Sequence, residues 1–177
     1  MLRALLLLAA LALRAPCGPT IPPPPGEASE YGVRAALILA FARIAEWPAK
    51  ALPASPDFVI GVMGEDPFGS HLEAFRGLQV KGRRVVVQHF RTPADYRPCQ
   101  VLYFPTASER FLDPLRERLN ADSVLTIGEG EGFPRRGGAL RFLQEGGRIR
   151  YVVNRQALEH AGLRMPAKVL SLAKEVL

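Results

Sequence analysis

The sequence predicts an α/β fold, a three-layer sandwich with a mostly parallel sheet, a C-terminal β-hairpin and helices on both faces. Three observations lead to this prediction. From residue 31 onward, short apolar runs alternate with segments of helical periodicity. The run 58–63 is almost continuously apolar, which is typical of a strand buried on both faces of a parallel sheet. Near the C-terminus, Gly146 and Gly147 separate two β-rich runs, and this pattern indicates a hairpin.

The first half of the domain is expected to open with a helix. Apolar side chains recur at helical spacing over residues 31–47, and Pro48 ends the helix. The buried strand at 58–63 comes next. A short helix is then predicted over 67–75, because Pro67 is well placed in the first turn of a helix.

The second half continues the alternation. Further strands are predicted over 84–89, 100–104 and 123–127, with an amphipathic helix over 108–120. The two arms of the hairpin are 140–144 and 148–153. Asn154 is expected to cap a short helix that runs through Glu159. Pro166 opens a last helix, whose apolar stripe continues to Leu177.

Residues 1–17 are predicted to be a secretory signal peptide that is absent from the mature chain. Arg3 precedes an apolar run that Arg14 closes, and the run is shorter than the roughly 18 residues that a membrane span needs. Three cleavage positions fit the sequence: after Ala12, Ala15 or Gly18. We therefore expect an exported protein without a membrane anchor. The alternative is a lipoprotein acylated on Cys17.

Residues 18–29 are predicted to be a proline-rich tether, and residues 30–177 form one folded domain. The tether contains four consecutive prolines, which favour an extended chain that packs no core. About 150 residues are enough for one domain that buries around 70% of its unfolded surface. Without the leader, the chain carries 21 cationic and 17 acidic side chains, a net charge of +4 that is spread along the sequence. Nucleic-acid binding requires a stronger basic patch, so no nucleic-acid partner is expected.

The sequence contains no recognisable catalytic or metal-binding pattern, so we expect no enzyme activity, no metal and no cofactor. Two cysteines cannot make a tetrahedral zinc site, and the three histidines have no ligand-like spacing. Cys99 is expected to be a buried small hydrophobe. Four acidic residues in loops could form a carboxylate pair for glycan hydrolysis if the loops converge: Glu65, Asp66, Glu129 and Glu131.

Ligands of open α/β sheets bind beyond the carboxyl ends of the strands. Three loops leave such ends, at 64–69, 105–108 and 128–133. The first is the best candidate, because Asp66 can cap free amides where the next helix begins. An exported ligand-sensing or substrate-binding domain with its pocket at these loops is therefore an alternative function.

An ordered set of short motifs extends over nearly all of the predicted domain. They are FARIAEWP from Phe41, FVIGVMGEDPFG from Phe58, GR at Gly82, VVV at Val85, CQVLY from Cys99, VLTIG from Val124, GG at Gly137, and the segment from Asn154 through AGL at Ala161 to KVL at Lys168. Together they resemble the YfiR/HmsC family of periplasmic regulators. Some relatives hold disulfides and Cys99 matches one such position, but a second mature cysteine exists only if Cys17 is retained.

The resemblance implies a periplasmic negative regulator without chemistry of its own. Such a protein binds the periplasmic sensor region of a membrane-bound diguanylate cyclase and so lowers cyclic di-GMP synthesis, exopolysaccharide output and biofilm formation. An outer-membrane lipoprotein is a second candidate partner, and a homodimer is a candidate assembly.

Seven residues are candidates for partner contact: Glu46, Trp47, Asp66, Pro67, Phe68, Arg148 and Arg150. Tryptophan and arginine are enriched in binding hot spots. Trp47 is either a packed helix end or such a hot spot, and Phe68 is either a hydrophobic plug or an exposed anchor. Arg148 and Arg150 share one face of the hairpin, where they contact either solvent or an acidic partner.

Overall fold

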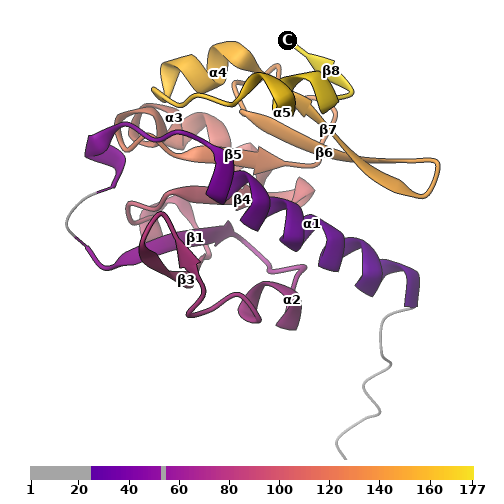
Figure 1. Ribbon diagram of the computed structural model, residues 1–177, viewed down its shortest axis with the longest axis horizontal. Coiled ribbons are helices and arrows are strands. Elements are labelled where there is room, and N and C mark those ends of the chain that lie inside the picture. The colour runs from indigo at the N-terminus through magenta and orange to yellow at the C-terminus, as the bar shows by residue number, and fades with distance from the viewer. Residues whose placement is uncertain (1–24, 53–54) are drawn as a thin grey trace, which may run out of the picture.

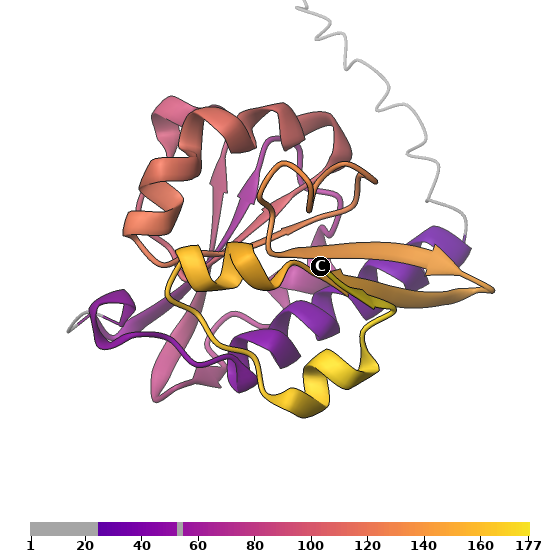
Figure 2. The same cartoon turned by 90° about the horizontal axis from the view of Figure 1, so that it is seen from above.

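The computed structural model describes residues 25–52 and 55–177, which form an eight-stranded sheet with helices on both faces (Figures 1 and 2). The predicted fold class is confirmed. The predicted leader and most of the predicted tether lie outside the described residues. The first helix begins at Pro25, so the last five residues of the predicted tether are helical.

The sheet has the spatial order β2-β3-β1-β4-β5-β6-β7-β8. Its strands are β1 (Asp57–Met63), β2 (Gln79–Val80), β3 (Arg83–Phe90), β4 (Val101–Phe104), β5 (Leu125–Gly128), β6 (Leu140–Glu145), β7 (Arg148–Val153) and β8 (Glu175–Val176). The five strands from β3 to β6 are parallel, β2 and β7 each run antiparallel to a neighbour, and β8 is parallel to β7. Every residue of β4 and β5 is buried, as expected for strands covered on both faces.

Helices cover the two faces of the sheet. They are α1 (Pro25–Ile44), α2 (Ser70–Glu73), α3 (Leu112–Ala121), α4 (Arg155–His160) and α5 (Ala167–Leu172), with shorter 3-10 turns η1 (Ala49–Ala51), η2 (Pro93–Asp95) and η3 (Thr106–Phe111). One core lies between the sheet and α1, α2, α4 and α5, and the second lies under α3. Figure 2 shows α1 and α3 on opposite sides of the sheet. Among the described helices, none is long and apolar enough to span a membrane.

The C-terminus differs from the prediction. Helix α5 ends at Leu172, and the expected continuation to Leu177 is wrong, because Glu175 and Val176 form strand β8 beside Val152 and Val153. The last two residues of the expected stripe, Val176 and Leu177, fit a strand as well as a helix when taken alone. The unpaired edge of β7 decides between them, because it offers backbone partners to an extended chain. The two-residue strand β2 was also not predicted.

Two local predictions are confirmed. Asn154 caps α4, since its side-chain oxygen accepts a hydrogen bond from the Ala157 N–H at 2.9 Å. The hairpin turns at Gly146 and Gly147, whose φ angles of 56° and 72° lie in the left-handed region that a tight two-residue turn requires. The two arms of the hairpin run together beyond the rest of the sheet (Figure 1).

Candidate functional site

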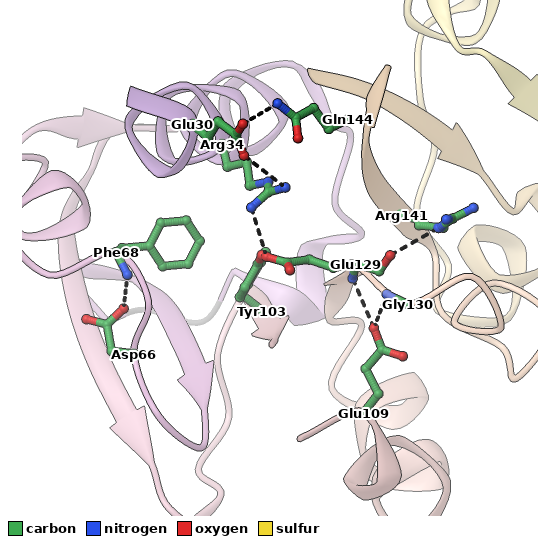
Figure 3. Close-up of polar contacts among 10 residues, drawn as sticks. All are labelled: Glu30, Arg34, Asp66, Phe68, Tyr103, Glu109, Glu129, Gly130, Arg141 and Gln144. Atoms are coloured by element: carbon green, nitrogen blue, oxygen red, sulfur yellow. Dashed lines mark hydrogen bonds and ion pairs between the residues drawn. The ribbon is translucent and has the colours of Figure 1, made fainter. Parts of the chain in front are cut away.

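The three loops predicted to form a working edge converge at the carboxyl ends of β1, β4 and β5. These strands are parallel neighbours, so their carboxyl ends meet at the same edge of the sheet. Side chains from the three strand ends meet there with side chains from α1 (Figure 3). We call this group the carboxyl-edge cluster: Tyr31, Arg34, Phe68, Tyr103 and Glu129.

Aromatic rings form one half of the carboxyl-edge cluster. The Phe68 ring lies edge-to-face with Tyr103, at 4.6 Å between centroids, and with Tyr31, at 5.5 Å. Phe68 is only 2% exposed. The interpretation of Phe68 as an exposed anchor is therefore wrong, because the ring offers no surface to a partner, and Phe68 is instead a hydrophobic plug.

Asp66 holds the backbone that carries this plug. Its side chain accepts a hydrogen bond from the Phe68 N–H at 2.8 Å and contacts His89 Nε2 at 3.0 Å. Asp66 therefore caps the turn that precedes α2. It does not cap α2 itself, whose N-cap residue is Gly69.

A buried ion pair forms the other half of the cluster. The Arg34 Nη1 atom lies 3.4 Å from Glu129 Oε1, and the Arg34 side chain is 9% exposed. The guanidinium also stacks over the Tyr31 ring at 4.7 Å. Glu30, one turn earlier in α1, contacts Arg34 at 3.9 Å and accepts a hydrogen bond from Gln144 of β6. Arg34 therefore links α1 to the end of β5, and Glu30 links α1 to the hairpin.

Tyr103 completes the polar contacts of the cluster by donating a hydrogen bond from its hydroxyl to Glu129. Burial raises the pKa of the Tyr103 phenol far above its ordinary value, and the charge of Glu129 raises it further. The same two causes raise the pKa of Tyr31. Both tyrosines therefore remain protonated at neutral pH.

Glu109 is a buried residue of this edge that the sequence analysis missed. Its carboxylate accepts hydrogen bonds from the backbone N–H groups of Glu129 and Gly130 and pairs with Arg136 at 2.9 Å. It thereby fixes the loop after β5. A glutamate in the first turn of an amphipathic helix is usually exposed, so the local pattern gave no indication of burial. Gly130 is the available signal, since a Cβ added there would clash with the Glu109 carboxylate.

The loops converge, but they do not bring a carboxylate pair together. Glu129 contacts Arg34 and Tyr103, Asp66 contacts His89, and Glu65 and Glu131 are exposed. No contact within the described part of the chain joins two of these four carboxylates. Over the same residues, no group of three or more histidine, cysteine or acidic side chains could hold a metal ion.

Three cavities in the described part of the chain are lined by residues outside the carboxyl-edge cluster. One of about 490 Å³ is lined by Arg155, Leu158, Glu159, Leu163, Arg164, Met165 and Leu170. Another, of about 320 Å³, separates the start of α1 from the hairpin and is lined by Glu30, Val33, Gly147, Arg148 and Ile149. A third, of about 170 Å³, lies at the amino ends of the strands and includes Cys99. Cys99 is buried as predicted, and it has no disulfide partner among the described residues.

The residues predicted to contact a partner fall at two ends of α1. Asp66 and Pro67 are partly buried at the carboxyl edge, while Arg148 and Arg150 are exposed on the hairpin. Neither arginine has an ion-pair partner within residues 30–52 and 55–177. The remaining two, Glu46 and Trp47, lie just beyond the other end of α1, roughly 24 Å from Tyr31 at 1.5 Å per residue.

Trp47 is a packed helix end. Its ring lies edge-to-face with Phe58 at 5.4 Å and is partly buried. Its indole N–H is buried without a hydrogen-bond partner among the described residues. Glu46 is exposed, and its backbone pairs with that of Arg164.

Comparison with known proteins gives structural relatives and a family. A crystal structure of a conserved domain protein from Vibrio cholerae O1 biovar El Tor strain N16961 matches with a TM-score of 0.51 and 16% identity, over 83% of this chain and 60% of that one. An ABC domain in complex with L-Trp from Streptococcus pneumoniae matches with a TM-score of 0.47 and 10% identity, over 68% and 55% of the two chains. This chain thus spans about 60% of the first structure, and that likeness shows the fold alone.

No curated protein matches the sequence. The family model described as YfiR/HmsC-like, however, matches residues 31–174, which is most of the chain and all of the described domain except residues 25–30 and 175–177. The resemblance noted from the sequence motifs is confirmed, and the chain belongs to the YfiR/HmsC-like family, a family of periplasmic regulators.

Proposed function

We propose that this protein is a periplasmic negative regulator that binds the sensor region of a membrane-bound diguanylate cyclase and inhibits the enzyme. Membership of the YfiR/HmsC-like family over residues 31–174 is the observation that carries this proposal. The family is not a known enzyme family. Lower cyclic di-GMP and reduced biofilm and exopolysaccharide output would follow from such inhibition.

The arrangement of the carboxyl edge also favours a binding protein. A ligand-sensing or catalytic domain needs a pocket with convergent polar groups. At this edge, Phe68, Tyr103 and Arg34 are themselves buried, and both the Arg34 guanidinium and the Tyr103 hydroxyl contact the Glu129 carboxylate. The described cavities open elsewhere, beside helices and the hairpin.

The outer face of the hairpin is the surface that we propose for partner contact. On its inner face, Phe142 and Tyr151 pack against Phe41 of α1. Residues of the opposite face alternate with these along each strand. We call that surface the hairpin arginine face: Arg141, Leu143, Arg148 and Arg150.

Charge complementarity indicates what this face would bind. Leu143 lies opposite Arg150 in the register, so the basic groups surround a partly exposed apolar side chain. Glu145, at the end of the same face, is already paired with Lys174. An acidic surface of the cyclase sensor region would supply the missing carboxylates, and arginine pairs well with carboxylates. Asp66 and Pro67, together with Glu46 and Trp47, remain proposed secondary contacts.

Gene deletion tests the proposed function. In the organism that encodes the chain, deletion should raise cyclic di-GMP and surface attachment, and the wild-type gene should restore both. The Arg150→Glu variant should restore them poorly, whereas Arg91→Glu, at an exposed arginine away from the hairpin, should restore them fully. Unchanged cyclic di-GMP in the deletion strain, with a membrane-bound cyclase shown to be expressed, would contradict the proposal.

A further inference from the structure

Glu145 places a carboxylate at the tip of the hairpin, beside the hairpin arginine face. Its register partner is Arg148, directly across the antiparallel pair, and side chains at such positions lie within contact distance of each other. The positive charge of Arg150 also acts on this carboxylate and contributes to lowering the pKa of Glu145. Glu145 therefore has two arginines within reach, on the surface that we propose for partner contact.

The ion-pair partner of Glu145 is neither arginine but Lys174. The Lys174 ammonium group donates a hydrogen bond to the Glu145 carboxylate. This hydrogen bond and the charge of Lys174 lower the pKa of Glu145 more than the charge of Arg150 does. Both arginines are exposed, and neither forms an ion pair within the part of the chain that the structure describes. Lys174 thus takes the carboxylate that Arg148 or Arg150 could otherwise bind.

The backbone holds Lys174 where it can reach the tip of the hairpin. Lys174 directly precedes β8, and its N–H donates a hydrogen bond to the Tyr151 carbonyl of β7 at 2.8 Å. Strand β8 then continues beside Val152 and Val153, at the base of the hairpin (Figure 1). Arg148, which faces Glu145, lies three residues from Tyr151 along β7, and the long side chains of Lys174 and Glu145 span this distance.

We propose that Lys174 is a positioning residue for partner binding, which holds Glu145 and so keeps Arg148 and Arg150 free for the carboxylates of a partner. This role rests on the proposed function, and it assigns a task to a residue that need not touch the partner. Without Lys174, the Glu145 carboxylate would pair with one of the two arginines. The face would then neutralise itself, and an acidic surface would have to displace Glu145 before it could bind.

Calorimetric titration with the purified cyclase sensor region tests this role. Lys174→Met should weaken binding by about fivefold, the most that an exposed ion pair usually contributes. Adding Glu145→Gln should restore the wild-type affinity, and Lys174→Arg should retain it, because arginine also pairs with carboxylates. The matched control is Lys168→Met, at an exposed lysine of α5 that has no ion-pair partner among the described residues. It removes the same charge and should change the affinity by less than about twofold.

Two results of this titration would overturn the positioning role. Binding by the double variant that is as weak as binding by Lys174→Met would show that Lys174 contacts the partner itself or supports the fold. An equal loss in Lys168→Met would show that the total charge of the protein matters and the pairing of Glu145 does not. Melting temperatures measured alongside would separate a loss of folding from a loss of contact.

Arginine modification tests the same role without the cyclase. Phenylglyoxal reacts with free guanidinium groups, and its rate at each arginine can be followed by mass spectrometry of peptides. In Lys174→Met, the rate at Arg148 or Arg150 should fall by about threefold, and Glu145→Gln should restore it. Arg91, exposed and away from the hairpin, is the internal reference. Equal rates in the wild type and in Lys174→Met would overturn the positioning role. The expected rates in a wild type that binds no cyclase would instead contradict the proposed function alone.

Discussion

The carboxyl edge and the outer face of the hairpin both carry arginines, but the surroundings of these arginines are opposite. Arg34 is buried and lies between the carboxylates of Glu30 and Glu129. Arg148 and Arg150 are exposed, and no described carboxylate pairs with them. A buried charge must have its partner within the fold, whereas an exposed charge can take one from another molecule. The first region therefore contributes to stability, and the second is available for binding. Five substitutions test this division, in order of decreasing expected effect on stability.

The largest effect is expected from Phe68→Ala. The ring is buried between Tyr31 and Tyr103, so its removal leaves a cavity in the carboxyl-edge cluster. We expect a loss of about 3 to 5 kcal/mol in the free energy of unfolding, measured with denaturant. Phe68→Leu should cost less because it retains more of the volume. A loss below about 1 kcal/mol for Phe68→Ala would show that the plug is not part of the core.

Arg34→Met should be nearly as costly. It leaves Glu129 partly buried without its cation, and removing one member of a buried pair typically costs about 3 to 5 kcal/mol. The matched control is Arg116→Met, whose ion pair with Asp113 is exposed on both sides and should be worth less than about 1 kcal/mol. Combining Arg34→Met with Glu129→Gln should recover part of the loss. Equal losses in the free energy of unfolding for the buried and the surface pair would show that burial does not make the arginine important for stability.

Tyr103→Phe should have a smaller effect at neutral pH and a distinct effect in alkali. At pH 7 it removes one hydrogen bond to the Glu129 carboxylate, worth about 1.5 to 3 kcal/mol. The folded-state pKa of Tyr103 is raised above the ordinary value of 10.0, so the wild type loses stability as the pH rises past that value and the unfolded chain ionises first. The variant lacks this contribution. Its stability should therefore fall less steeply in denaturant titrations between about pH 9 and pH 11. If the unfolding free energies of the wild type and of Tyr103→Phe fell in parallel over this pH range, the raised pKa of Tyr103 in the folded state would be contradicted.

The smallest effect on stability is expected from Arg148→Ala and Arg150→Ala. Both side chains are exposed, so unfolding free energies should change by no more than about 0.5 kcal/mol. Affinity for the purified cyclase sensor region should nevertheless fall, by about thirtyfold if either residue is a hot spot. Unaltered affinity in both variants would place the partner surface elsewhere.

The sequence allowed the central elements to be predicted because their signals are local. The apolar run of β1, the two glycines of the hairpin turn and the Asn154 cap each depend on a few adjacent residues. Strand β8 could not be predicted in this way, since it exists because the edge of β7 is open.

The location of the candidate site was predictable, but most of its contacts were not. Parallel strands place their carboxyl ends at one edge, so the convergence of the three loops follows from topology. Arg34 was overlooked because the periodicity of α1 draws attention to its apolar residues. The partner that keeps Arg34 buried, Glu129, belongs to a loop far along the chain. Similarly, the burial of Glu109 depends on two backbone amides after β5.

The buried position of Cys99 gives the protein an internal reporter of its own opening. Only 2% of the residue is exposed, and burial raises the pKa of its thiol, so a thiol reagent cannot react with it in the closed fold. In a Cys17→Ser chain, modification of Cys99 must wait until the amino end of β4 separates from its neighbours. Where reclosing is faster than modification, the labelling rate gives the equilibrium constant for that separation. The opening of the central strand can thus be followed without introducing a new cysteine, both in the purified protein and in the cell envelope.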